Sequence, residues 1–275
     1  MTVPNAPAEI YTFPTKAAVG DELCRQIVTI CQEAMQQRGV FTVAMSGGSL
    51  PAMLSNLPQT FKNQGVDPQY SKWHVLLADE RGVPETHKDS NLLALQKSFL
   101  SLPGVSIPSK NIYGINKMSL CESMHAVALD YHTKLLSVLP KSGGHLDLAL
   151  LGMGEDGHTC SLFPNHPLLQ QRQVHVAPIE DSPKPPPHRI TLTFRALEQT
   201  RQVIFCATGA AKSPILAQIV QKACRTNNHD GTPSPLITAE ICAAYPCGMV
   251  RPQDRLVYIV DEDAMKQVAI ATAEP

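Results

Sequence analysis

Net charge and long apolar runs are both nearly absent from this sequence. The 275 residues hold 23 Lys and Arg against 24 Asp and Glu, which leaves a formal net charge of −1. Without a basic excess we expect neither nucleic acid nor an anionic membrane as a partner. No apolar run reaches the length of a membrane span, and the opening MTVPNAPAEIYTF lacks the charged and apolar regions of a signal peptide. Any anion that binds must therefore be met by a few local cations.

Cysteine pairs with metal-binding spacing are also lacking. The chain has 8 cysteines, at positions 24, 31, 121, 160, 206, 224, 242 and 247, and none forms a CxxC pair. Cys24 and Cys31 lie two helical turns apart on one predicted helix, which indicates buried free thiols in a reducing compartment. No cluster of His, Cys and acids has ligand spacing, so we predict that no metal is required.

Hydrophobic residues, at 43%, are distributed so that strands and helices alternate along the chain. We predict strands at 10–13, 41–45, 73–78, 111–115, 146–151, 174–179, 189–194, 202–208 and 256–260. We predict helices at 16–37, from Pro51, and at 89–100, 119–138, 210–223 and 263–271, with a loop over 222–235. No linker or internal repeat interrupts the pattern. It predicts a single domain over 1–275 with a Rossmann-like, doubly wound α/β fold, whose mostly parallel sheet has helices on both faces.

Glycines and charged residues follow several of these strands. Ser46-Gly47-Gly48-Ser49 leads from a strand into a helix that starts near Pro51, an arrangement that can hold a phosphate on backbone N–H groups. Many such turns bind nothing. Asp79-Glu80-Arg81 ends the strand 73–78, and such a group can also be a solvated turn.

A histidine follows the apolar strand 146–151 through a turn with three glycines. Gly152, Gly154 and Gly157 are spaced among acids that include Asp156, and His158 follows directly. Imidazole titrates near neutral pH and a nearby carboxylate can orient it, so this segment is a candidate general base. The alternative is a glycine-rich turn in which the histidine only caps the backbone.

A lysine occupies an unusual place after the strand 202–208. Lys212 falls in the first turn of the predicted helix, where the helix dipole favours an acid. A solvated lysine is the plain alternative. Because the carboxyl ends of parallel strands share one sheet edge, the segments at 46–48, 79–81, 152–158 and 208–212 should gather there and form one site.

The residues resemble those of the 6-phosphogluconolactonases over nearly the whole chain. The motifs that carry the resemblance are SGGS at 46–49, DER at 79–81, LGMGEDGHTCSLFP at 151–164, DSPKPPPHR at 181–189 and ATGAAK at 207–212. The resemblance implies a cytoplasmic enzyme of the pentose phosphate pathway. It would hydrolyse 6-phospho-D-glucono-1,5-lactone to 6-phospho-D-gluconate with no organic cofactor, and no obligate protein partner is inferred.

Two other functions fit the same segments. Glucosamine-6-phosphate deaminases also carry Gly-Asp-Gly-His, but they have a glutamate before the following proline and a tyrosine after Asp-Glu. Here those positions are Phe163 and Arg81. A non-catalytic sugar-phosphate sensor is the other alternative, although no DNA-binding helix-turn-helix precedes the domain.

The resemblance and the chemistry of a lactone together assign roles. The family's catalytic base falls on His158, with Asp156 or Asp79 as the acid that orients it. Arg81 would stabilise the carbonyl oxyanion or bind phosphate. The remaining candidates for binding phosphate are Ser46, the amides of Gly47, Gly48 and Ser49, Lys212, and Arg189 if its strand runs antiparallel. No serine nucleophile elbow is present, which disfavours a covalent ester.

Overall fold

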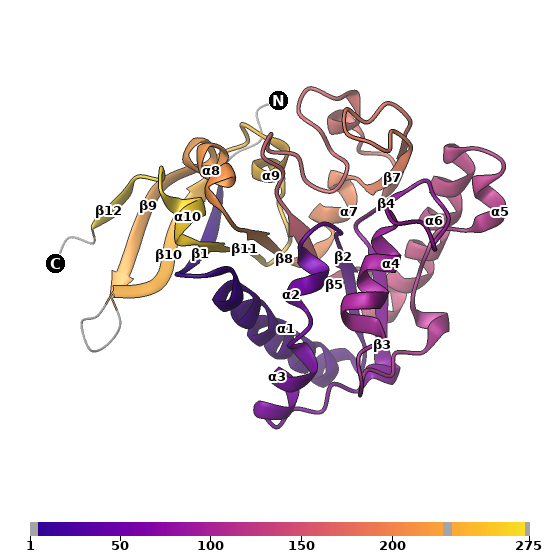
Figure 1. The fold of residues 1–275 in the computed structure, drawn as a ribbon, viewed down its shortest axis with the longest axis horizontal. Coiled ribbons are helices and arrows are strands. Elements are labelled where there is room, and N and C mark those ends of the chain that lie inside the picture. Colours follow the sequence, from indigo (N-terminus) through magenta and orange to yellow (C-terminus); the bar gives the residue numbers. More distant parts are fainter. Residues whose placement is uncertain (1–4, 228–232, 273–275) are drawn as a thin grey trace.

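The fold is organised around a large sheet. The computed structural model describes residues 5–227 and 233–272, and within them nine strands pair in the order β12-β9-β10-β1-β11-β8-β5-β2-β3 (Figure 1). These strands are β1 (Ala6–Phe13), β2 (Phe41–Met45), β3 (Trp73–Leu77), β5 (Leu146–Gly152), β8 (Thr200–Ala207), β9 (Val220–Asn227), β10 (Pro233–Ile241), β11 (Arg255–Asp261) and β12 (Ile270–Thr272).

Most of this sheet is parallel. Strands β1, β11, β8, β5, β2 and β3 all run in one direction, whereas β10 is antiparallel to both β1 and β9. Every residue of β2 is buried, as expected for a strand that is covered on both faces. The predicted fold class is therefore confirmed: a mostly parallel α/β sheet with helices on both faces.

Helices connect the strands and cover the sheet (Figure 1). The longest, α1 (Lys16–Arg38), begins where the Thr15 hydroxyl accepts a hydrogen bond from the Ala18 amide, and ends at Gly39 with φ +68°. The others are α2 (Leu50–Met53), α3 (Leu57–Asn63), α4 (Asn91–Leu95), α5 (Lys117–Leu120), α6 (Met124–Val138), α7 (Phe194–Glu198), α8 (Ser213–Ile219), α9 (Pro246–Met249) and α10 (Glu262–Met265).

A second, three-stranded sheet lies beside the first. Its order is β4 (Asp79–Arg81), β7 (Arg189–Leu192) and β6 (Val176–Ile179), and both pairings are antiparallel. The Leu192 amide donates to the Ala78 carbonyl at the end of β3, which joins the two sheets. Arg189 therefore pairs with Arg81 across β4 and β7. This antiparallel pairing satisfies the condition for Arg189 to reach the site.

Several predicted elements are wrong in type or length. The helix expected over 210–223 is a short 3₁₀ turn, then α8, then strand β9 from Val220. The expected loop over 222–235 is instead the β9 and β10 strands wherever the structure describes it, and 228–232 lie outside the described residues. The helix expected over 263–271 is the short α10 followed by β12. In the first and third places strand pairing overrides a local helical pattern, and in the second it orders a polar segment that was expected to be a loop.

Three smaller differences have local causes. Ser123 caps α6 through the Ala126 amide, so the helix expected over 119–138 is divided into α5 and α6. The strand expected over 111–115 is reduced to a single bridge between Ile112 and Val75. The strand expected over 189–194 ends at Leu192 and is wholly buried rather than half-buried, because it lies inside the second sheet.

Candidate active site

One cavity of about 410 Å³ lies at the carboxyl ends of the parallel strands. Residues from all four predicted segments line it, which confirms that the segments gather at one edge. The predicted site residues in its lining are Ser46, Gly47, Gly48, Ser49, Asp79, Arg81, His158, Arg189 and Lys212. Asp156 is outside the lining and contacts the cavity through His158.

His158 and Asp156 form a hydrogen-bonded pair. The distance from His158 Nδ1 to Asp156 Oδ1 is 2.5 Å. A carboxylate can only accept, so Nδ1 carries the proton and Nε2 keeps the lone pair that a general base needs. Asp79 has no such bond to the ring: its Oδ2 accepts from the Ser161 hydroxyl at 2.9 Å. Of the two acids left open by the sequence, Asp156 is the one placed to orient His158.

The turn that holds this pair depends on Gly154. A Cβ atom built at this position would lie 2.0 Å from His158 Nδ1 and 2.4 Å from Asp156 Oδ1. The pair therefore packs directly against the Gly154 backbone, and any side chain there would displace it. Gly157 has φ +81°, a conformation that favours glycine, and reverses the chain before His158.

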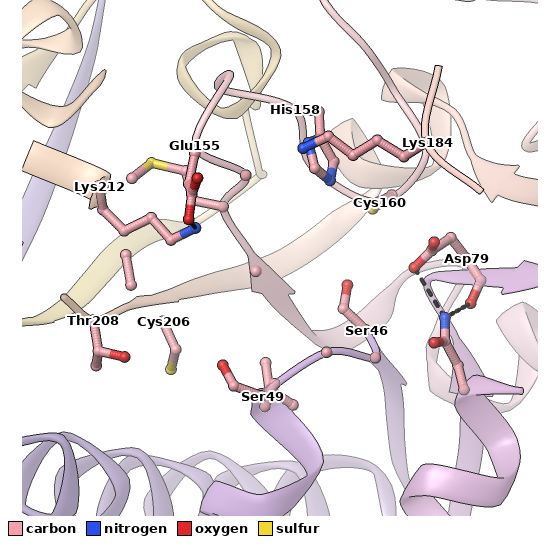
Figure 2. Close-up of a pocket in the computed structure, with 18 of the residues that line it drawn as sticks. Ser46, Ser49, Asp79, Glu155, His158, Cys160, Lys184, Cys206, Thr208 and Lys212 are labelled. Carbon is pink, nitrogen blue, oxygen red and sulfur yellow. Dashed lines mark hydrogen bonds and ion pairs between the residues drawn. The ribbon is translucent and has the colours of Figure 1, made fainter. Parts of the chain in front are cut away.

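Lys184 completes the charged group around His158. Its amine donates to Asp156 Oδ1 at 3.2 Å and lies 3.4 Å from His158 Nδ1, and Figure 2 shows it beside the ring. Lys184 is not among the site residues predicted from the sequence. Its position in the sequence could have indicated a role, because Lys184 is the one lysine or arginine in the proline-rich segment 181–188.

The surroundings shift two pKa values in this group. Burial lowers the pKa of His158 below its ordinary value of 6.5, the Asp156 carboxylate opposes the shift, and the Lys184 charge adds to it. Partial burial tends to raise the pKa of Asp156, but its hydrogen bonds with His158 and Lys184 outweigh this and bring it to about 2. At neutral pH the pair is therefore a neutral imidazole held by an ionised carboxylate.

Arg189 positions the segment that carries Lys184. Its Nε donates to the Pro186 carbonyl at 2.9 Å, and its Nη2 donates to the carbonyls of Lys184 and Pro185. Arg189 is 3% exposed. Only its Nη1, which donates weakly to the Ser161 hydroxyl at 3.4 Å, is not engaged with the backbone. Arg189 thus reaches the cavity as predicted, with most of its guanidinium committed to the loop.

Asp79 and Glu80 occupy different environments although they are adjacent. Asn91 donates its side-chain amide to the Asp79 carbonyl at 2.8 Å, a bond drawn in Figure 2. Glu80 is 2% exposed and accepts the amides of Arg81, Asn91 and Leu92. Burial raises the pKa of Glu80, and those backbone amides oppose the shift. Glu80 therefore caps α4 and fixes the loop, while Asp79 and Arg81 border the cavity.

Lys212 lies at the other side of the cavity from Lys184 (Figure 2). Its amine is 4.0 Å from the Glu155 carboxylate, and Glu155 is much the more exposed of the two. Burial lowers the pKa of Lys212, and the charge of Glu155 opposes the shift. Lys212 is in a 3₁₀ turn, Ala210–Lys212, immediately before α8 rather than inside the helix as predicted.

The loop between β2 and α2, residues 46–49, lines the cavity between Lys184 and Lys212. A Cβ at Gly47 would lie 1.9 Å from Asn91 Oδ1, so only glycine allows the loop to approach α4. Gly48 has φ +69°. Ser46 and Ser49 flank this glycine pair and both line the cavity. The loop thus exposes its backbone to the cavity, as the phosphate interpretation requires.

Two further features bear on cofactors and membranes. Within residues 5–227 and 233–272, no group of three or more His, Cys, Asp or Glu side chains is arranged to hold a metal ion. In the same ranges no helix is both long and apolar enough to cross a bilayer.

Comparison with known proteins identifies the family. A model of the family described as glucosamine-6-phosphate isomerases/6-phosphogluconolactonase matches residues 14–256. The chain belongs to this family. It is 35% identical over 270 residues to the 6-phosphogluconolactonase of Rattus norvegicus, covering 96% of this chain and 95% of the relative. It is 38% identical over 219 residues to a probable 6-phosphogluconolactonase of Schizosaccharomyces pombe, covering 77% and 83%.

Other relatives are longer than this chain. A probable chloroplastic 6-phosphogluconolactonase of Oryza sativa is 38% identical over 214 residues, and the match spans 63% of its length. Among solved structures, the 6-phosphogluconolactonase of Thermotoga maritima superposes with a TM-score of 0.71 at 25% identity, covering 92% of this chain and 99% of that one. A monomeric glucosamine-6-phosphate deaminase superposes with a TM-score of 0.69 at 14% identity, covering 94% and 99%, which shows a shared fold.

Proposed function

We propose that this member of the family hydrolyses 6-phospho-D-glucono-1,5-lactone to 6-phospho-D-gluconate. The observation that carries the proposal is the His158–Asp156 pair, which faces a cavity bordered by the cations Arg81, Lys184 and Lys212. A base beside several separated cations suits a substrate with an electrophilic carbonyl at one end and a phosphate at the other. The names of the relatives from Rattus norvegicus and Schizosaccharomyces pombe support the same activity.

The reaction begins with a water molecule. His158 Nε2 takes a proton from the water as its oxygen bonds to the lactone carbonyl carbon, and the carbonyl electron pair moves onto its oxygen. When that pair returns, the bond from the carbon to the ring oxygen breaks. The protonated Nε2 then gives its proton to the ring oxygen, which leaves a free hydroxyl. The acid product ionises, so each turnover releases one proton to solution.

The positions of the cations suggest different roles in binding and catalysis. Lys184 lies beside the base, and Arg81 pairs with Arg189, which holds the Lys184 segment, so these two cations would stabilise the negative charge that develops on the carbonyl oxygen. Lys212 and the amides of the loop over Gly47–Ser49 would hold the phosphate. Arg189 would hold the segment that carries Lys184 and offer only Nη1 to an anion.

Deaminase activity is the second candidate, and the fold is shared with it. The loop position that would need an acid is Phe163, whose ring lies 4.7 Å from the His158 ring centroid at an interplanar angle of 31°. A phenyl ring cannot exchange a proton with the substrate. We therefore favour lactone hydrolysis over ring opening of an amino sugar, and turnover of lactone would also exclude a sensor that only binds.

The proposal is tested by proton release after addition of freshly prepared lactone, measured above its spontaneous hydrolysis. We expect rapid release that saturates with lactone concentration. Ammonia release from glucosamine 6-phosphate is the control, and we expect none. Ammonia release without lactone hydrolysis would overturn the proposal in favour of a deaminase.

We further infer that the enzyme acts in the cytoplasm within the pentose phosphate pathway, with a small phosphosugar lactone as its substrate. The net charge of −1 supports the absence of nucleic acid and membrane partners. We infer no obligate protein partner. Partition of the tagged full-length chain between cell fractions tests the location.

The acid limb of activity should lie below pH 6.5. His158 must be neutral to act as a base, and burial holds its pKa below 6.5, so kcat/KM should stay high at pH 6.5 and fall only at lower pH. A series of kcat/KM against pH, corrected for spontaneous hydrolysis, measures this limb. In Lys184→Ala the limb should move to higher pH, because the lysine charge lowers the pKa of His158. A limb above pH 6.5 in the parent enzyme would contradict the assignment.

Activity should not depend on a metal. His158 can activate water without one, and no metal-binding group is present in the described parts of the chain. Dialysis against a strong chelator should leave kcat unchanged, with the same assay before and after as its control. A lasting loss that zinc or magnesium restores would show that the mechanism is wrong.

A further inference from the structure

We infer that Asp261 is the residue that positions Lys212 for phosphate binding, an inference that rests on the proposed function. Asp261 is at the end of β11 and does not line the cavity, so it cannot touch the substrate there. It lies 49 positions beyond Lys212 in the sequence and belongs to none of the motifs that indicate the site. Its contacts nevertheless end on the loop that carries this lysine.

The Asp261 carboxylate holds that loop at its first residue. Both carboxylate oxygens lie 2.9 Å from the Gly209 amide nitrogen, and Oδ1 also accepts the Ala264 amide at 2.9 Å. Asp261 is 7% exposed. A buried carboxylate bound to backbone N–H groups forms a strong, directional contact, because those bonds replace its lost hydration. One side chain therefore joins β11, the start of α10 and the Lys212 loop.

The backbone between Gly209 and Lys212 links the position of Gly209 to that of the lysine. Gly209 has φ +91°, so the chain turns sharply at the residue whose amide donates to Asp261. The Lys212 amide then donates to the Gly209 carbonyl at 3.0 Å and closes the 3₁₀ turn. A second tie follows at once, since the Ser213 hydroxyl accepts the Gln267 amide at 2.8 Å. With both ends of the turn anchored, the Lys212 side chain projects into the cavity toward Glu155 (Figure 2).

The anchor matters because a lysine side chain is long and flexible. Holding its backbone in place reduces the entropy that is lost when the amine settles on a phosphate. Removal of the anchor should weaken phosphate binding without changing the His158 chemistry on the other side of the cavity. The effect should therefore appear in KM for phosphorylated substrates and not in kcat.

The test is the substitution Asp261→Asn in the full chain. Asparagine keeps the shape and one acceptor oxygen but removes the negative charge, and its NH₂ group, itself a donor, faces the Gly209 N–H, so the charge-assisted contact to this amide is lost. We expect KM for the phosphorylated lactone, and the inhibition constant of inorganic phosphate, to rise about tenfold, the effect of losing one hydrogen bond to a charged group. We expect kcat to change less than about twofold, and activity on unphosphorylated gluconolactone to be unchanged.

A second buried carboxylate provides a matched control. Asp147 is 1% exposed and accepts the Thr42 amide at 2.8 Å as well as a bond from Arg38. It is near the start of β5, at the opposite end of the strand from the Gly152 that borders the cavity. Asp147→Asn should lower the melting temperature but leave KM and the phosphate inhibition constant unchanged. If loss of stability alone raised KM, both variants would show the rise. If Asp261 positions Lys212, only Asp261→Asn will show it.

Two more variants keep the inference testable if Asp261→Asn folds poorly. At Gly209 a Cβ would meet nothing within 4 Å, so Gly209→Ala adds no clash but strains the φ of +91° that the loop needs. It should reproduce the rise in KM. The double variant Asp261→Asn with Lys212→Ala should bind phosphate no worse than Lys212→Ala alone, since the anchor acts through the lysine.

The outcomes separate this inference from the proposed function. If the parent chain fails to hydrolyse lactone, the proposed function fails, and calorimetric binding of inorganic phosphate to the same variants still tests the anchor. If the parent hydrolyses lactone but Asp261→Asn leaves KM unchanged, lowers kcat instead, or weakens both substrates equally, the inference about Asp261 is overturned. Additive losses in the double variant would overturn it as well.

Discussion

His158→Ala is expected to lower kcat for lactone hydrolysis by about 10²–10⁴-fold, the usual contribution of a general base. The imidazole is held by Asp156 at 2.5 Å with its other nitrogen available to water, and alanine removes that nitrogen. Affinity for 6-phosphogluconate should persist, because the proposed phosphate site lies on other loops. Initial rates of proton release, corrected for the spontaneous reaction, and product binding by calorimetry measure the two effects.

His158→Gln is the matched variant for this prediction. Glutamine keeps a polar side chain but cannot usefully accept a proton, so its kcat should be as low as that of the alanine variant. Near-parental hydrolysis by His158→Ala would contradict the mechanism. The base would then have to be a carboxylate, and Asp79, which is buried at the cavity wall, would be the first to test.

Lys212→Ala is expected to raise KM for the phosphorylated lactone by about 10- to 150-fold. A charge-assisted hydrogen bond from a partly buried lysine to phosphate contributes about 1.5–3 kcal/mol, and burial has already removed part of the hydration of this amine. Activity on unphosphorylated gluconolactone should hardly change, because that substrate has no group for the lysine to meet. Steady-state kinetics on both substrates provide the measurement.

Lys222→Ala is the control for a general effect of charge. This lysine lies on β9 with a side chain that is 75% exposed and paired with Glu240. Its removal lowers the net charge by the same amount and should leave both KM values unchanged. Equal losses of activity on the two substrates in Lys212→Ala would show that the lysine acts elsewhere than on the phosphate.

The sequence by itself determined the class of the fold and the place of the site. Apolar runs such as 146–151 are typical of strands covered on both faces, and a parallel sheet brings the residues after them to one edge. That reasoning needs no knowledge of side-chain contacts, which is why Ser46, Arg81, His158 and Lys212 were correctly placed in one cavity.

The tertiary structure alone decided which groups pair inside the cavity. The choice of Asp156 over Asp79 depends on distances of a few ångströms, which spacing along a chain does not determine. Lys184 lies beside His158 on a proline-rich loop whose three carbonyls accept hydrogen bonds from Arg189, a residue of the second sheet. The same is true of strand β9, where pairing with β10 overrides a helical pattern. Contacts between residues far apart in the sequence are fixed by the packing of whole helices and strands, so local sequence patterns do not predict them.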